Sequence, residues 1–229
     1  MSKTVLITGT NRGIGLELVK QYAHDKWNVI ACCRKPEISI KLHEIAFQYP
    51  NIKVSRLDVC SSQSIGYLKD EIKYQPIDLI INNAGIYRKD PESRDIAIED
   101  IVQTFLTNSV APLKISEALI DNLLKSELKL IVVITSRLGS IGFNTVSGHY
   151  SYRASKAAVN MLMKNFSIDW KDKGIRVLLL HPGWVKTDMN ENKAPLDISI
   201  SVAGLRKVIM DKKDAPGIYY DYTGQEIPW

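Results

Sequence analysis

The chain has 229 residues, of which 45% are hydrophobic and 24% charged, as is typical of one compact globular domain. Its 30 lysines and arginines exceed its 25 aspartates and glutamates by five, but they are scattered rather than grouped as nucleic-acid binding requires. No apolar run approaches the about 20 residues of a membrane span, and we expect no leader before the first apolar run. Cys32, Cys33 and Cys60 fit neither a disulfide framework nor a metal motif. We therefore expect a cytoplasmic single domain over residues 1–229 that binds no metal, membrane or nucleic acid.

Short apolar segments rich in β-branched residues alternate with longer helical patterns. The predicted strands are, in chain order, Val5–Ile7, Asn28–Cys33, Ile52–Ser55, Ile77–Ile81, Leu130–Thr135, Ile175–Leu180 and Ile218–Tyr220. Helices are predicted over Gly13–Asp25, Ile101–Leu124 and Tyr152–Trp170, and near Ser199. Several strands are apolar at consecutive positions, which indicates that both faces are covered. The pattern predicts a Rossmann-like α/β fold, a doubly wound parallel sheet of about seven strands with helices on both faces.

A glycine-rich turn follows the first strand and opens the first helix. It reads Thr-Gly-Thr-Asn-Arg-Gly-Ile-Gly from residue 8 to residue 15. Such glycines permit a tight turn and a close approach of the backbone to a phosphate, which the N–H groups at the helix start would bind. Three glycines can also serve only to shape a turn, but their place in the first βα unit favours a dinucleotide site. The expected contacts are Gly9, Asn11, Arg12, Gly13, Ile14 and Gly15.

The end of the second strand indicates which dinucleotide binds. An NAD site places an acidic residue there for the ribose 2′-hydroxyl, whereas this chain has Arg34 and Lys35. A guanidinium offers two parallel donors to a 2′-phosphate, and Arg12 could reach the same group. Arg34 and Lys35 could instead be a solvated pair, yet the missing carboxylate favours NADP(H) over NAD(H).

A tyrosine and a lysine lie one helical turn apart near the start of the third predicted helix. Tyr152 and Lys156 share a face because positions i and i+4 are neighbours on a helix. A nearby ammonium favours the phenolate, so we expect Lys156 to lower the pKa of Tyr152. The same pattern can arise from an exposed pair, and Tyr150 competes for the tyrosine role, although Lys156 would then face elsewhere.

These residues belong to a wider pattern, and the chain resembles the short-chain dehydrogenase/reductase family over nearly its whole length. The matching motifs are Thr8-Gly9-x-x-x-Gly13-x-Gly15, Asn82-Asn83-Ala84-Gly85, Tyr152-x-x-x-Lys156 and Pro182-Gly183-Trp184-Val185-Lys186-Thr187. Tyr-Arg-Ala-Ser-Lys and the final Pro-Trp are similar to the C-factor-like carbonyl reductase branch. The resemblance implies Tyr152 as general acid, Lys156 holding the nicotinamide ribose, and Ser136 bonding the substrate carbonyl.

The resemblance also implies Asn108 as a fourth catalytic residue. Pro112 lies four residues later and has no N–H, so the Asn108 carbonyl loses its helical partner. A water linking that carbonyl to Lys156 is the favoured interpretation, and the alternative is that Asn108 is a surface residue beside a kink. The position of the serine departs from the family pattern. Relatives often place it thirteen residues before the tyrosine, and that residue is Gly139 here. Ser136 is preferred because it follows a strand, and Ser140 is the alternative.

Further cofactor contacts follow from the resemblance, all at the carboxyl ends of predicted strands. Asp58 would accept from adenine, unless it only caps a helix, and Pro182 would help to hold the carboxamide. The full set beyond the glycine turn, Arg34 and the Tyr–Lys pair is Asp58, Val59, Asn83, Ala84, Gly85, Pro182, Gly183, Val185 and Thr187.

The leading hypothesis is an NADPH-dependent reductase of a small aldehyde or ketone. The alternative is an NADP(H)-sensing or signalling protein of the C-factor type with little turnover, and nucleic-acid binding is a distant third. Relatives associate through the helices that carry the asparagine and the tyrosine, which implies a homodimer or homotetramer. Trp184 and Phe143 line an apolar pocket or belong to the core.

Overall fold

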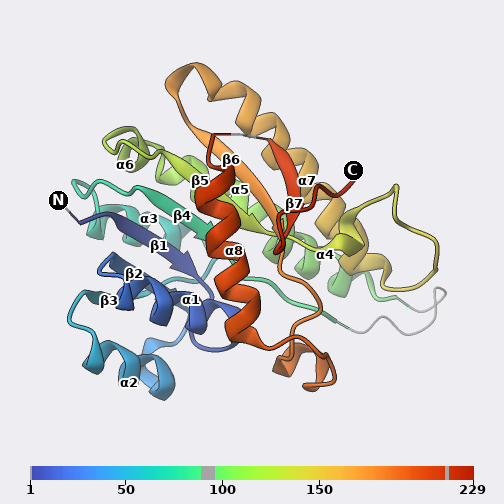
Figure 1. Cartoon of the computed structure of the whole chain (residues 1–229), viewed down its shortest axis with the longest axis horizontal. Helices are drawn as coiled ribbons and strands as arrows, with labels where there is room; N and C mark the ends of the chain where they lie inside the picture. The colour runs from blue at the N-terminus through green and yellow to red at the C-terminus, as the bar shows by residue number, and fades with distance from the viewer. Residues whose placement is uncertain (1, 89–95, 215–216) are drawn as a thin grey trace.

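A single parallel sheet forms the centre of the computed structural model, which describes residues 2–88, 96–214 and 217–229. Its strands lie in the order β3-β2-β1-β4-β5-β6-β7, and every pair is parallel (Figure 1). The bounds are β1 Thr4–Thr8, β2 Asn28–Cys33, β3 Ile52–Arg56, β4 Leu79–Asn82, β5 Leu130–Ile134, β6 Arg176–His181 and β7 Ile218–Asp221. The predicted seven-stranded, doubly wound sheet is confirmed.

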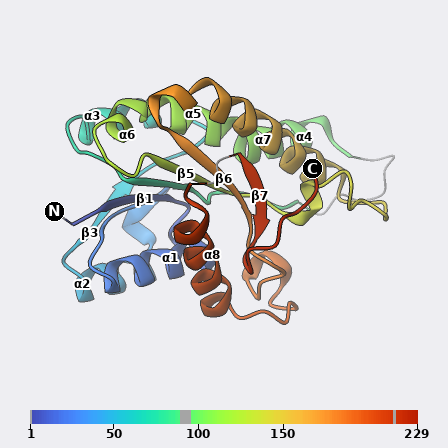
Figure 2. The same ribbon diagram turned by 45° about the horizontal axis from the view of Figure 1, so that its top comes forward.

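Helices cover both faces of this sheet. One layer holds α1 Gly13–His24, α2 Ile40–Gln48 and α8 Ile198–Lys212, and the other holds α3 Ser62–Glu71, α4 Ile98–Phe105, α5 Ala111–Ala118, α6 Ile120–Leu124 and α7 Tyr150–Asp169 (Figure 2). Short turns of helix complete the chain: η1 Pro36–Ile38, η2 Leu106–Val110, η3 Arg137–Gly139, η4 Lys171–Lys173 and η5 Asp188–Asn190.

Each layer buries its own apolar core against the sheet. Neighbouring strand residues point to opposite faces, so Cys32 packs with Met163 of α7 on one side, while Cys33 packs with Leu18 of α1 on the other. Both of these cysteines are free and buried. Cys60, by contrast, is exposed, and its thiol contacts the Thr107 hydroxyl at 3.2 Å.

The long helix predicted over Ile101–Leu124 is broken into segments, which corrects that prediction. Pro112 lies in the first turn of α5, and the preceding residues Leu106–Val110 form a π-helical turn. There the Ala111 N–H bonds to Leu106, five residues back. Proline cannot donate to the carbonyl four residues before it, and a π-turn accommodates the disrupted ladder. A second break follows at Leu119, between α5 and α6.

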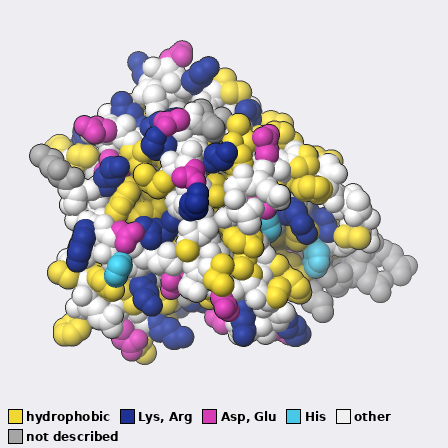
Figure 3. Space-filling view, viewed as in Figure 1, with side chains coloured by type: hydrophobic (Ala, Val, Ile, Leu, Met, Phe, Trp, Pro, Cys, Tyr) yellow, Lys and Arg dark blue, Asp and Glu magenta, His cyan; other side chains and the backbone are white. Residues whose placement is uncertain are grey.

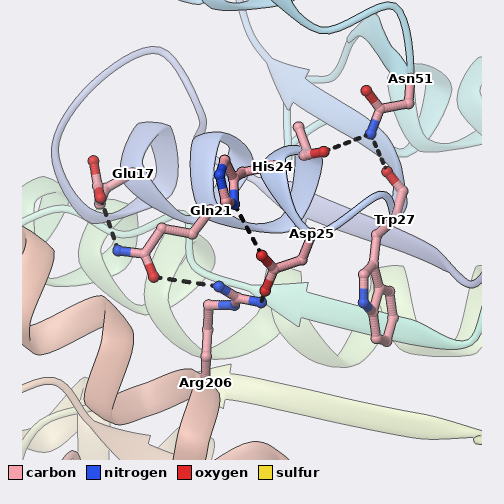
Figure 4. A network of polar contacts seen from close by, with 8 residues as sticks. Glu17, Gln21, His24, Asp25, Trp27, Asn51 and Arg206 are labelled. Atoms are coloured by element: carbon pink, nitrogen blue, oxygen red, sulfur yellow. Dashed lines mark hydrogen bonds and ion pairs between the residues drawn. The ribbon is translucent and has the colours of Figure 1, made fainter.

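Polar side chains fasten the last helix to the first. Arg206 of α8 donates to Asp25 at 2.5 Å and to Gln21 of α1 at 3.4 Å (Figure 4). The guanidinium also lies 4.5 Å from the centre of the buried Tyr22 ring. Arg206, and then His24, hold the pKa of the Asp25 carboxyl below its usual range. These contacts fix α8 against α1, on the face of the sheet opposite α7.

Among the helices of the described residues, none has the length and apolar content to cross a membrane.

Candidate active site

The glycine turn lies where the strand order reverses. After β1 the chain goes outward to β2 and β3, then returns to the other side of β1 at β4, and open α/β sheets bind ligands at such a switch point. Within the described residues, five successive N–H groups of the turn have no hydrogen-bond acceptor: those of Asn11, Arg12, Gly13, Ile14 and Gly15. They lie at the N-terminus of α1, a twelve-residue helix whose dipole favours an anion. This donor set fits the pyrophosphate of a dinucleotide.

Two of the glycines are required by the chain itself. Gly9 has φ +71°, and a Cβ there would lie 2.9 Å from the Cα of Ala84. A Cβ on Gly15 would lie 2.2 Å from the carbonyl oxygen of Gly9. Asn83 closes the same turn by donating from its side chain to Thr8 at 2.9 Å and to Gly9 at 3.2 Å. Its amide therefore shapes the turn, a role that the motif alone did not reveal.

The segment after β6 lies across the glycine turn. A Cβ on Gly13 would contact the Thr187 methyl at 3.7 Å, and Arg12 pairs with Asp188 at 3.3 Å. Gly183, with φ +89°, leaves room for Leu196 and the Tyr222 ring. Around it the Pro182 carbonyl accepts from Ser201, and Val185 is buried. The Pro-Gly motif thus folds this segment toward the nucleotide side of the sheet.

The adenosine side of the crevice is formed by the ends of β2 and β3. Arg34, directly after β2, is exposed and makes no hydrogen bond or ion pair with the described residues. The Asp58 carboxylate accepts from the Cys60 N–H at 3.0 Å within a local turn, while helix α3 is capped by Ser61, so the alternative that Asp58 caps a helix is wrong. Val59 is only 8% exposed and packs in the core, which leaves its main chain to face a ligand.

Tyr152 and Lys156 do border one site, near the start of α7. The Lys156 Nζ lies 5.7 Å from the centre of the Tyr152 ring, and the lysine is only 5% exposed. Its ammonium donates to the carbonyl of Ile134 at the end of β5, at 3.0 Å. The tyrosine and lysine of the motif therefore meet at the carboxyl edge of the sheet.

Their electrostatics differ from the prediction. Burial raises the pKa of Tyr152 to about 12, a shift that the Ser136 hydroxyl opposes and Tyr87 reinforces. Burial also lowers the pKa of Lys156 to about 8. The expected lowering of the tyrosine pKa by Lys156 is thus wrong for the chain alone, where desolvation of the phenolate is the largest effect on that pKa.

Ser136 follows β5 and caps the turn η3. Its Oγ accepts from the Leu138 N–H at 3.2 Å, which leaves its proton free to be donated toward Tyr152. The position thirteen residues before Tyr152 is Gly139, and it has no room for a serine because a Cβ there would lie 2.8 Å from the main chain of Lys156. Ser140, the alternative, is 2% exposed and donates to the Pro228 carbonyl. The geometry therefore favours Ser136.

Asn108 lies in the π-helical turn and faces the same site. Its side chain accepts from the Ile86 N–H at 2.8 Å and donates to the Ile86 carbonyl at 2.9 Å and to Ser155 at 3.1 Å. Both polar atoms of this side chain are thus engaged, so the predicted relay would have to use the main-chain carbonyl of Asn108. Gly85 lies between the two groups, since a Cβ there would be 3.3 Å from Asn108 Oδ1 and 3.7 Å from Lys156 Nζ.

Two aromatic residues at the site, Tyr87 and His149, were not predicted from the sequence. The Tyr87 ring meets Tyr152 edge to face with centres 5.4 Å apart, and its hydroxyl lies 2.8 Å from His149 Nδ1. Tyr87 lies two residues after the last glycine of the Asn-Asn-Ala-Gly motif, a proximity that could have indicated it. Trp184 and Phe143 are 61% and 51% exposed, so neither belongs to the core.

Comparison with known proteins agrees with this geometry. Residues 3–197 match the family model described as short chain dehydrogenase. The C-signal of Myxococcus xanthus is 39% identical over 155 residues, which are 67% of this chain and 93% of that protein. The NADPH-bound carbonyl reductase from chicken fatty liver is 33% identical with a TM-score of 0.91, over 100% of this chain and 99% of the other. The carbonyl reductase Sniffer of D. melanogaster is 31% identical, also with a TM-score of 0.91, over 100% of both chains.

Proposed function

The chain belongs to the short-chain dehydrogenase family, in its C-factor-like branch, and from this premise we propose that it is an NADPH-dependent reductase of small aldehydes or ketones. The observation that carries the proposal is the meeting of Tyr152, Lys156 and Ser136 beside the switch point that the glycine turn lines. A nucleotide-binding protein without chemistry would not need this set of groups.

NADP(H) is the proposed cofactor. The free N–H groups of residues 11–15 would bind its pyrophosphate, and the unpaired Arg34 would bind the 2′-phosphate. The carbonyl reductase from chicken fatty liver, similar over the whole chain, has NADPH bound. We also assign cofactor contacts to Arg12, Asp58, Val59, Asn83, Ala84, Gly85, Pro182, Gly183, Val185 and Thr187, where Asn83 acts by shaping the turn.

When bound, the reduced nicotinamide supplies a hydride to the carbonyl carbon. Tyr152 donates the proton that the carbonyl oxygen takes up, and its raised pKa keeps that proton in place until negative charge develops. The Ser136 hydroxyl, held by Leu138, donates a hydrogen bond to the same oxygen.

Lys156 and Asn108 support this proton donor. The Lys156 ammonium is held by the Ile134 carbonyl, from where it orients the nicotinamide ribose. The Asn108 main chain, placed by the π-turn, binds a water that returns a proton toward Lys156. Both assignments come from the family, and the distances at Gly85 support them only in that the Asn108 side chain and the Lys156 ammonium lie close to the same glycine.

The similarity to the C-signal of Myxococcus xanthus favours one alternative, an NADP(H)-sensing or signalling protein with little turnover. Nucleic-acid binding has less support, since basic and acidic side chains are interspersed over the face shown in Figure 3.

The direct test is a panel of aldehydes, diketones and quinones with NADPH, followed by the loss of nicotinamide absorbance. The proposal predicts that one NADPH is consumed for each alcohol formed from an aldehyde or ketone, or for each hydroquinone formed from a quinone. Tight NADPH binding without turnover of any carbonyl in the panel would instead support the sensing alternative.

We also propose self-association, as a homodimer or homotetramer. Ile98, Val102, Leu106 and Val110 recur every four residues along α4 and η2, and all are exposed. Such a stripe on an amphipathic helix is typical of a protein–protein interface.

A further inference from the structure

The carbonyl group of Ser136 is held from two directions. The Gly139 N–H donates to it at 2.7 Å within the turn η3, and the hydroxyl of Tyr219 donates to it from β7. Tyr219 comes from the edge of the sheet, 83 residues along the chain from Ser136. Two donors fix the plane of this peptide group, and with it the direction in which the serine side chain leaves the backbone.

Tyr219 is itself firmly placed. Its side chain is fully buried and packs in the core beneath α7. Burial raises the pKa of its phenol above the ordinary value, so the group remains a hydrogen-bond donor throughout the range in which proteins are stable. A buried phenol whose single proton points to the main chain of another residue acts as a fixed support.

Residues 227–229 contact both Tyr219 and the segment that follows Ser136. The Ile227 N–H bonds to the Tyr219 carbonyl at 2.7 Å, and the Trp229 ring lies 5.9 Å from the Tyr219 ring. The main-chain oxygen of Trp229 accepts from the Gly142 N–H at 2.8 Å, while Pro228 accepts from Ser140. Residues 227–229 therefore join β7 to the far end of the segment that begins at Ser136.

We propose that Tyr219 is a positioning residue for catalysis, which, braced by residues 227–229, aims the Ser136 hydroxyl at the reacting carbonyl oxygen. This inference rests on the proposed function and adds a residue that none of the sequence motifs contains. Tyr219 does not touch the reacting atoms and acts only through Ser136.

The test compares Tyr219→Phe with Tyr220→Phe, alone and combined with Ser136→Ala. Tyr220 is a matched control because it is the next residue, is 5% exposed and packs in the core of the opposite face. We expect Tyr219→Phe to lower kcat about three- to tenfold, the factor that one hydrogen bond contributes. The Kd for NADPH and the KM for the carbonyl should change little, and Tyr220→Phe should leave kcat unchanged.

The double variant separates positioning from general support of the fold. If Tyr219 acts through Ser136, Tyr219→Phe lowers kcat in the wild-type chain but not in the Ser136→Ala background. An equal loss in both backgrounds, or no loss in either, would overturn the inference. Unfolding temperatures from circular dichroism identify a variant whose loss of kcat comes from unfolding.

A second variant removes the contact between residue 229 and Tyr219 but keeps the hydrogen bond from Tyr219 to the Ser136 carbonyl. Trp229→Leu keeps the main-chain bond to Gly142 but removes the ring beside Tyr219, and we expect a smaller fall in kcat that Ser136→Ala again abolishes. Failure of the proposed function is distinguishable, because then Ser136→Ala itself would have no effect on NADPH turnover. A normal Ser136→Ala loss beside an inert Tyr219→Phe contradicts only the positioning role.

Discussion

The phenol of Tyr152 and the ammonium of Lys156 share a desolvated site, and burial disfavours the charged form of each. Tyr152 consequently has its pKa raised to about 12 and Lys156 has its pKa lowered to about 8. A raised pKa suits a residue that must keep a proton until a carbonyl oxygen takes it. The lysine is the group that titrates within the working range.

Activity should therefore follow the ionisation of Lys156. Below about pH 8 it carries the ammonium that holds the ribose, and above that pH it becomes neutral, so kcat/KM for NADPH should stay level and then fall about tenfold per pH unit. Tyr152 stays protonated over the same range and therefore adds no second inflection to the pH profile of kcat/KM. A profile that remains flat up to pH 10, with the fold intact by circular dichroism, would contradict the assignment.

Arg34 provides a separate prediction about the cofactor. Arg34→Ala should weaken NADPH binding about tenfold or more, because a charge-assisted contact to the 2′-phosphate is lost, and should leave NADH binding unchanged. Lys35→Ala, at the adjacent exposed position, is the matched control. Fluorescence titration with both nucleotides measures the effect, and equal losses for NADPH and NADH would show that Arg34 does not read the 2′-phosphate.

At the scale of single elements, the sequence predicted the strands better than the helices. Short apolar segments rich in β-branched residues marked every strand of the sheet to within about two residues of its observed ends. The helices α2 and α3 were not predicted, because they bury few residues and so have weak periodicity; α3 buries only Ile65 and Leu68 within Ser62–Glu71. Pro112 indicated a kink, but the π-turn depends on packing that no local pattern reveals.

The turn η3 and helix α7 are in backbone contact at Gly139, which makes a glycine exchange informative. Gly139→Ala should destabilise the fold by about 1–3 kcal/mol and lower kcat, because its methyl would overlap the main chain of Lys156. Gly66→Ala, within exposed α3, meets nothing within 4 Å and should stabilise the fold by about 0.5–1 kcal/mol. Thermal unfolding measures both, and a neutral Gly139→Ala would show that the contact is loose.

The catalytic residues of the site were predictable because each belongs to a local motif. The residues that contact them from distant segments, Tyr219 and Tyr87, were not. Tyr152 and Lys156 are four residues apart, so helical geometry alone brings them together. Tyr219 reaches Ser136 only through the placement of β7 at the sheet edge, and Tyr87 reaches Tyr152 across the crevice. Contacts between distant segments need the folded sheet. The pKa direction failed for the same reason, since burial cannot be read from spacing.

At the scale of the whole molecule, a row of exposed apolar side chains follows α4 and η2. The α4 and η2 stripe with Val102 at its centre lies in the layer that contains α7, and it is the face through which we expect copies to associate. Val102→Glu should shift the mass measured by light scattering from oligomer toward monomer, because burying an unpaired carboxylate opposes association. Phe47→Glu, at a 93% exposed position on α2, should not. A monomeric wild-type chain would overturn this expectation.

The central claim is that the Tyr152 phenol gives the proton in carbonyl reduction while the rest of the site binds the cofactor. Its most direct test is Tyr152→Phe, which removes one oxygen, with NADPH binding and single-turnover hydride transfer measured on the same sample. The account predicts a rate at least about a hundredfold lower, the contribution of a positioned general acid, with NADPH affinity nearly unchanged. A variant that transfers hydride at the wild-type rate would contradict it.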